Sequence, residues 1–121
     1  MSVFLEVSDN DKIYSGVNFF LIKDRFPVSP GHVLIISNDL KKDFFELNEE
    51  ELVQLNHSII KAKSLIDSTF NPIGYNIGMN CGLAAGQTIF HFHCHIIPRY
   101  QGDTQNPSGG VRGVIPNKQH Y

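Results

Sequence analysis

The chain has 121 residues, of which 41% are hydrophobic and 18% charged, and this composition is typical of one folded globular domain. The net charge is −2, with 10 basic and 12 acidic residues and no run of lysine or arginine, which argues against a nucleic-acid-binding protein. The sequence shows no apolar segment that is long enough to cross a membrane and no secretory signal. We therefore expect a cytoplasmic protein in which Cys81 and Cys94 are reduced thiols.

The first 37 residues predict two strands that are separated by turns. Val3 to Val7 is apolar and forms either a first strand or an early turn, and Val17 to Lys23 is predicted to be a strand because it is rich in aromatic and β-branched residues. Two prolines and a glycine between Phe26 and Gly31 exclude regular structure there. His32 to Ser37 is almost continuously apolar, which predicts a central strand that is covered on both faces.

The middle of the chain changes to a helical pattern. Asp39 is expected to begin a short helix that ends near Leu47, and the spacing of Asn48 and Glu51 predicts a capping box at the start of a longer helix. Apolar residues then follow in steps of three and four at Leu52, Leu55, Ile59, Ala62 and Ile66. This stripe predicts a long helix that packs against a sheet and ends before Pro72.

The remaining residues complete a predicted α+β fold. Ile73 to Met79 and Thr88 to Ile97 are predicted strands, and the loop from Asn80 to Gln87 is rich in small residues. The segment 101–121 contains many glycines and prolines, which predicts an irregular C-terminal arm. The sequence thus predicts a single domain over residues 1–121, with one long helix, one short helix and four or five strands.

Three histidines alternate with apolar residues in the last predicted strand. Alternation places Ile89, His91, His93, His95 and Ile97 on one face, and Phe90, Phe92, Cys94 and Ile96 on the opposite, core face. The three imidazoles are then spread over roughly 13 Å, because a strand rises about 3.3 Å per residue. Only neighbouring histidines can therefore meet at one substrate atom.

This histidine face allows three interpretations. The imidazoles can be structural groups whose nitrogens are all hydrogen-bonded, or they can bind a metal ion with His32 as a further ligand. The third interpretation is nucleophilic catalysis on phosphorus, since an imidazole is largely neutral and nucleophilic at pH 7. In that case Gly86, Gln87 and Thr88 would supply N–H groups and a hydroxyl for a phosphate, and His95 would serve as a proton donor or as an oxygen clamp.

The segment from Gly86 to Ile97 resembles the signature of the histidine triad (HIT) family, in which three histidines alternate with apolar residues after a Gly-Gln dipeptide. A second landmark lies upstream, where Asp24 to Leu34 resembles the proline-containing turn that leads to a fourth histidine in the family. The resemblance extends from about Val17 to Tyr100. It implies an α+β fold with an antiparallel sheet of about five strands that pairs with a second copy as a homodimer.

The resemblance also implies an activity and assigns roles to the histidines. The expected protein is a hydrolase that cleaves an adenosine or other purine nucleotide conjugate at the α-phosphate, through a nucleotidyl-histidine intermediate that water resolves. His93 would be the nucleophile, His95 would contact the phosphate or the leaving group, and His91 and His32 would orient the other two. The resemblance implies no cofactor and no structural zinc, because the extra cysteines of zinc-bearing relatives are absent.

The resemblance to the HIT family also implies which residues contact the nucleotide. Asp24 would bind the ribose hydroxyls, and the phosphate and neighbouring positions would be Asn80, Gly86, Gln87, Thr88 and Ile89. The base would lie against Phe19, Leu21 and Ile22. Asp24 and Asn80 resemble the Hint branch, which cleaves nucleoside phosphoramidates, whereas Ile97 to Arg99 resembles the Fhit and bacterial dinucleoside polyphosphate hydrolase branches. The substrate class therefore stays open, as do a regulatory nucleotide-binding module and a metal-dependent hydrolase.

Overall fold

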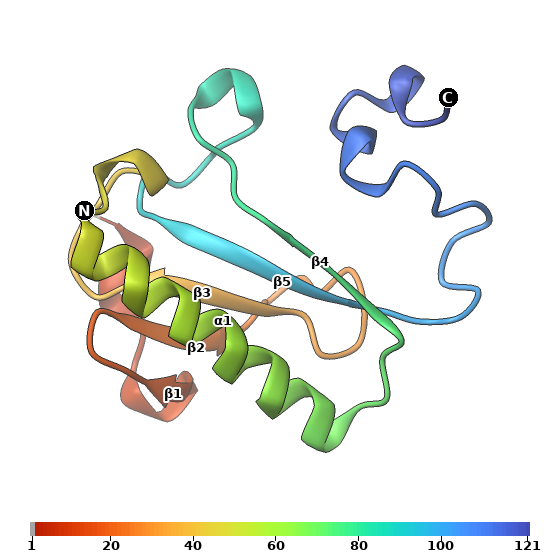
Figure 1. The fold of residues 1–121 in the computed structure, drawn as a ribbon. Helices are drawn as coiled ribbons and strands as arrows, with labels where there is room; N and C mark the ends of the chain where they lie inside the picture. Colours follow the sequence, from red (N-terminus) through yellow and green to blue (C-terminus); the bar gives the residue numbers. More distant parts are fainter. Residues whose placement is uncertain (1) are drawn as a thin grey trace.

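A computed structural model of the chain describes residues 2–121 (Figure 1). The strands are β1 (Lys12–Ser15), β2 (Phe19–Lys23), β3 (Val33–Ser37), β4 (Gly74–Gly78) and β5 (His93–Arg99), and the helix is α1 (Glu49–Thr69). Every strand pair is antiparallel, and the order in the sheet is β1-β2-β3-β5-β4. The predicted α+β fold with one long helix and a five-stranded sheet is confirmed. Within residues 2–121, no helix has the length and apolar character needed to span a membrane.

The long helix begins and packs as the sequence predicts. The Asn48 side chain accepts a hydrogen bond from the backbone N–H of Glu51, and the Glu51 carboxylate accepts one from the backbone N–H of Asn48. Such a cap stabilises a helix by about 1 kcal/mol. The buried positions Leu55, Ala62 and Ile66 continue the predicted stripe and face the sheet.

The predicted short helix from Asp39 to Leu47 is wrong in type and length. The segment forms only a 3₁₀ turn over Phe44–Glu46, capped by the Asp43 carboxylate, which accepts from the backbone N–H of Phe45. The Lys41 carbonyl accepts from the backbone N–H of Phe92, the Lys42 carbonyl accepts from the Gln87 side chain, and Asp43 is extended. These carbonyls are therefore not available for helical hydrogen bonds.

The N-terminal segment also differs from the simplest strand prediction. Val3–Glu6 forms a 3₁₀ helix, so the turn alternative for these residues is the one observed. β1 is not among the predicted strands. It is a four-residue edge strand with mostly exposed side chains and an irregular register against β2. A short strand of this kind has no apolar alternation that a sequence pattern would reveal.

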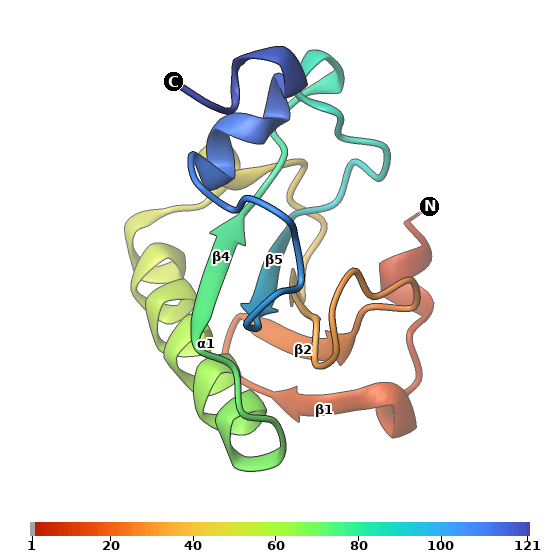
Figure 2. The ribbon, with the colours of Figure 1, turned by 90° about the vertical axis from the view of Figure 1, so that its right-hand side faces the viewer.

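The sheet has an apolar cluster on each face. On the α1 side lie Phe19, Leu21, Val33, Ile35, Phe92, Cys94 and Ile96, and on the opposite side lie Phe4, Phe20, Leu34 and Ile36. β3 is buried on both faces, which confirms the prediction of a central strand. Figure 2 shows α1 on one side of the sheet and the N-terminal segment on the other. Leu34 is paired with His95 and Ile36 with His93, so these histidines lie on the side away from α1.

The last strand begins at His93 rather than at Thr88. Phe92 lies opposite Ser37, where β3 ends, and its N–H donates to the Lys41 carbonyl, so the preceding residues leave the sheet. Phe90 is consequently 42% exposed, and its predicted core position is wrong. The alternation after this point is as predicted, because Phe92, Cys94 and Ile96 are all buried.

Residues 101–121 continue from β5 as turns and two short 3₁₀ helices, Gly110–Val114 and Pro116–Lys118. The arm is held together by Arg112, whose guanidinium donates to the carbonyls of Lys118 and Gln119. Gly109 has a φ of 84°, and a Cβ at this position would lie 2.1 Å from the Gln119 carbonyl oxygen. The close packing of the arm on itself therefore requires glycine at position 109.

Candidate active site

The structure gathers four histidines into one row on the side of the sheet away from α1. The ring of Phe4 contacts both His91 and His93, with ring centroids 5.5 and 5.1 Å apart. The His93 and His95 rings are 5.5 Å apart, and His32 lies 5.2 Å beyond His95. The row thus joins the three histidines near β5 to one that directly precedes β3.

His91 lies at the buried end of this row, where both ring nitrogens have partners. Nε2 is 2.7 Å from the Ser37 carbonyl oxygen, which can only accept, so Nε2 carries the hydrogen. Nδ1 lies 2.8 Å from the Ser2 hydroxyl, which donates to it. Burial lowers the pKa of His91 and favours this neutral form. The His91 side chain is fully buried, so it cannot itself contact a bound molecule.

His93 presents a free lone pair. Its Nδ1 lies 2.8 Å from the His91 carbonyl oxygen, so Nδ1 carries the hydrogen and donates it. A neutral imidazole has one N–H, and the lone pair is therefore on Nε2. The side chain is half-buried, and within residues 2–121 Nε2 has no hydrogen-bond partner.

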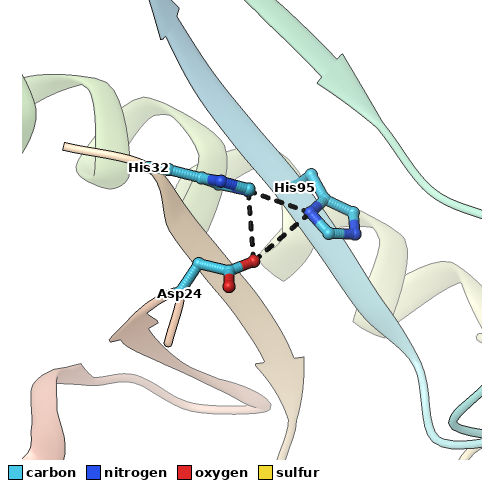
Figure 3. Close-up of side chains that lie close together, drawn as sticks. All are labelled: Asp24, His32 and His95. Carbon is cyan, nitrogen blue, oxygen red and sulfur yellow. Dashed lines mark hydrogen bonds and ion pairs between the residues drawn. The ribbon is translucent and has the colours of Figure 1, made fainter. Parts of the chain in front are cut away.

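Asp24, His32 and His95 form a compact cluster (Figure 3), and the His95 ring is also the neighbour of the His93 ring in the row. His32 Nε2 lies 2.9 Å from His95 Nδ1 and 3.3 Å from the Asp24 carboxylate, which is 3.8 Å from His95 Nδ1. Burial lowers the pKa of His32 and of His95, although the charge of Asp24 opposes the shift in both. The two imidazoles are therefore neutral near pH 7.

This cluster is compact enough to suggest a metal site, because one ligand atom from each residue lies within 4.8 Å of the others. Bonds of about 2.0–2.1 Å at tetrahedral angles would place zinc ligands about 3.3 Å apart. However, His32 Nδ1 accepts a hydrogen bond from the backbone N–H of Val28 at 3.2 Å. The hydrogen of His32 is then on Nε2, which has no lone pair for a metal ion, so the hydrogen bonds disfavour a metal ligand at His32.

The small-residue loop before β5 is held from inside by Gln87. Its buried amide donates to the carbonyls of Lys42 and Ile89, and its side-chain oxygen accepts from Gly82. The backbone N–H groups of Gly86 and Gln87 also donate within the loop. The expectation that these groups bind a phosphate is therefore incorrect for this arrangement, because their donors are already used. Thr88 is exposed, and within residues 2–121 its N–H and hydroxyl have no partner.

A family model described as the HIT domain matches residues 6–102. The chain belongs to the HIT family. It is 38% identical over 93 residues to Protein hit of Bacillus subtilis (strain 168), covering 76% of this chain and 64% of that protein. It is 40% identical over 77 residues to the asymmetrical bis(5'-nucleosyl)-tetraphosphatase of Schizosaccharomyces pombe, covering 64% of this chain and 42% of that protein.

A solved structure supports the same assignment. The crystal structure of a HIT family protein from Bacillus anthracis matches with a TM-score of 0.77 and 30% identity, covering 96% of this chain and 90% of that one. The chain spans less than two thirds of the length of the two relatives from Bacillus subtilis and Schizosaccharomyces pombe.

The HIT fold places two predicted base contacts on the wrong side of the sheet. Phe19 and Leu21 are fully buried against the α1 side of the core, so neither can contact a nucleobase. Ile22 has the opposite orientation and, like Ile89, packs against the apolar cluster on the histidine side. Alternation within β2 separates these residues, but only the pairing of β2 with β3 and β5 shows which face carries the histidines.

A cavity of about 760 Å³ opens beside His95 and includes residues that the sequence analysis missed. Asn80 and His95 lie in its wall, which the arm completes with Val111, Val114 and His120. Arg99, the only lysine or arginine among its described lining residues, donates two hydrogen bonds of 2.8 Å to Asp103. No sequence signal marks the arm as part of this wall, because its residues belong to no periodic element.

Proposed function

We propose that this HIT protein is a nucleotide hydrolase that cleaves a purine nucleotide conjugate at its α-phosphate, with His93 as the nucleophile. The observation that carries the proposal is the lone pair on His93 Nε2, fixed by the hydrogen bond from Nδ1 to the His91 carbonyl. A nucleophilic imidazole needs this tautomer, and an N–H group at Nε2 would prevent attack. The relative named as a tetraphosphatase supports a nucleotide as the substrate.

The proposed reaction has two displacement steps. In the first, His93 Nε2 forms a bond to the α-phosphorus, and the leaving atom departs with the electron pair of the broken bond and takes a proton from water. In the second, a water molecule attacks the nucleotidyl-histidine and loses a proton to solvent, which releases the nucleoside monophosphate and restores His93. The sum is hydrolysis, with one water consumed and no cofactor.

Other residues at this site would bind the nucleotide. Asp24 lies at the edge of the site with its side chain 13% exposed, where its carboxylate can accept hydrogen bonds from ribose hydroxyls. The free N–H and hydroxyl of Thr88 are the donors that we assign to the phosphate. Asn80 lies in the wall of the cavity, and Ile22 and Ile89 would contact the base.

The cavity beside His95 favours an organic leaving group over a polyphosphate. Additional phosphates would require free cations, whereas the Arg99 guanidinium is held by Asp103 and by the Asn76 side chain. The arm adds the apolar residues Val111 and Val114 to the wall. We therefore propose that a nucleoside phosphoramidate is a better substrate than a dinucleoside polyphosphate.

We also propose a homodimer in which β4 forms the contact. β4 is an edge strand that pairs only with β5 within residues 2–121, so its other edge is free to pair with a second copy. Ile77 on this strand is 44% exposed. A cytoplasmic location is proposed as well, and the two free thiols Cys81 and Cys94 are compatible with a reducing compartment.

A substrate panel with His93→Ala tests the function. We expect the wild-type protein to hydrolyse an adenosine phosphoramidate with a higher kcat/KM than a dinucleoside polyphosphate, and His93→Ala to lose both activities by about 10⁴-fold or more. His57→Ala is the control, because His57 is exposed on α1. Equal activity of His93→Ala and wild type would refute the nucleophile. Binding of the nucleotide by wild type without any turnover would favour a regulatory module instead.

A further inference from the structure

The turn before β3 contains a backbone group that determines the protonation of a histidine. The N–H of Val28 points to His32 Nδ1 at 3.2 Å. A backbone N–H can only donate, so Nδ1 must hold a lone pair, and this excludes both the Nδ1–H tautomer and the imidazolium form of His32. The single hydrogen of the His32 ring is therefore on Nε2.

The hydrogen on His32 Nε2 determines which nitrogen of His95 is protonated. His32 Nε2–H lies 2.9 Å from His95 Nδ1 and 3.3 Å from the Asp24 carboxylate, so His95 Nδ1 is the nearer acceptor. An acceptor nitrogen holds a lone pair, and the hydrogen of His95 is then on Nε2. Figure 3 shows this second nitrogen on the side of the His95 ring that faces away from His32 and Asp24.

The neighbouring rings of His93 and His95 then differ in the protonation of Nε2. His93 offers a lone pair at Nε2, whereas His95 offers an N–H at Nε2, and the two ring centroids are 5.5 Å apart. A hydrogen-bond donor beside a nucleophile stabilises the negative charge that develops on an oxygen or on the leaving atom. Of the two sequence-based roles for His95, this tautomer fits the clamp and not the proton donor, because a neutral imidazole N–H is a very weak acid.

We propose that the Val28 N–H is a positioning group that fixes, through His32, the Nε2–H tautomer of His95, and that His95 acts in catalysis as a neutral hydrogen-bond donor. This inference rests on the proposed function for its catalytic part. The protonation pattern itself does not depend on any activity. No proton leaves His95 in either displacement step, so the proton that the leaving atom takes comes from water.

Nitrogen-15 NMR of the full chain with labelled histidine tests the protonation pattern directly. We expect His32 and His95 to be protonated at Nε2 and unprotonated at Nδ1 at pH 7, while His93 shows the reverse pattern. Resonances are assigned with single His→Gln variants. A His95 ring that is protonated at Nδ1, alone or together with Nε2, would overturn the proposal whether or not the protein is an enzyme.

The variants Val28→Pro and Val28→Ala distinguish the effect of losing the Val28 N–H from the effect of changing its side chain. Proline removes the N–H, whereas alanine keeps it and shortens the same side chain, which is 70% exposed. We expect the kcat of Val28→Pro to lie about 10- to 100-fold below that of Val28→Ala with little difference in KM, as for the loss of a transition-state donor. Equal kcat values in two folded variants would contradict the proposal.

Substitutions of His32 provide a second measurement if Val28→Pro fails to fold. His32→Gln can keep an N–H donor toward His95, whereas His32→Met cannot. We expect kcat and the His95 tautomer to be closer to wild type in His32→Gln than in His32→Met. If kcat and the His95 tautomer were closer to wild type in His32→Met, His32 would not fix the tautomer of His95. Absence of turnover in wild-type protein would instead reject the proposed function, while the NMR pattern would still test the tautomers.

Discussion

The two faces of β5 are stabilised in different ways. On the α1 side, Phe92, Cys94 and Ile96 are buried among other apolar side chains, where burial contributes about 25 cal/mol per Å² of apolar surface. On the other side, His93 and His95 are partly exposed and are held by hydrogen bonds whose direction fixes each proton. The α1 face of β5 is therefore stable with any apolar side chains of suitable volume. The histidine face requires particular hydrogen-bond donors and acceptors.

The largest stability effect is expected on the α1 side. Ile35 is fully buried and pairs with Cys94, so Ile35→Ala should lower the free energy of unfolding by about 2–5 kcal/mol because it leaves a cavity. Urea denaturation measures this change. Ile60→Ala is the control, since Ile60 is 69% exposed on α1 and its loss should change stability by less than about 0.5 kcal/mol. Equal losses in the two variants would contradict the assignment of the core.

On the histidine face, a smaller loss of stability should accompany a loss of chemistry. His91→Leu keeps apolar volume but leaves the Ser37 carbonyl without its donor, which should destabilise the fold by about 1–3 kcal/mol. We also expect kcat to fall, because the His91 backbone carbonyl holds His93. His91→Gln can retain an amide donor to Ser37 and should lie between wild type and His91→Leu in urea denaturation. If His91→Leu were as stable as wild type, this hydrogen bond would have no role.

Acid should destabilise the protein through its buried histidines. The pKa values of His32, His91 and His95 are lowered mainly by burial, so below about pH 6.5 the unfolded chain binds more protons than the folded one. Stability should therefore fall from pH 7 to pH 5, with each histidine contributing a slope of up to about 1.4 kcal/mol per pH unit. Urea denaturation at several pH values should show a smaller slope in His91→Gln. A flat profile would contradict the neutral, buried state of these rings.

The smallest effect on the global stability of the protein is expected for a substitution in the C-terminal arm, residues 101–121. Gly109→Ala would place a Cβ 2.1 Å from the Gln119 carbonyl oxygen, so the arm should loosen while the unfolding of the sheet and α1 changes little. Gly102→Ala is the matched control, because Gly102 also has a positive φ, of 76°, but has open space around it. Hydrogen exchange of residues 108–121 should increase much more in Gly109→Ala. Equal exchange in both variants would show that this contact does not hold the arm.

The parts of the fold that the sequence predicted are those with local, repeating patterns. The capping box at Asn48 and Glu51, the apolar stripe of α1 and the alternation from Phe92 to Ile96 each depend on neighbouring residues. β1 and the short turn at Phe44–Glu46 lack such a pattern, and their structure depends on the strands and turns beside them. Local chemistry was therefore sufficient for α1 and the core face of β5.

The site was only partly predictable for the same reason. The alternation of His93 and His95 is a sequence pattern, but the exclusion of Phe19 and Leu21 required the register between strands. The internal role of Gln87 depends on Lys42, which lies 45 residues away. No sequence pattern indicates that the Val28 N–H faces His32, because this contact forms within an irregular turn.

The nucleophilic role of His93 is tested most directly by trapping the covalent intermediate. Wild-type protein would be mixed with an adenosine phosphoramidate, quenched with acid-free denaturant within one turnover, digested and analysed by mass spectrometry. We predict a nucleotidyl adduct on the peptide that contains His93, mapped to that residue by fragmentation. Turnover without an adduct, or an adduct on His91 or His95 instead, would contradict the assignment of the lone pair at His93 Nε2 as the attacking group.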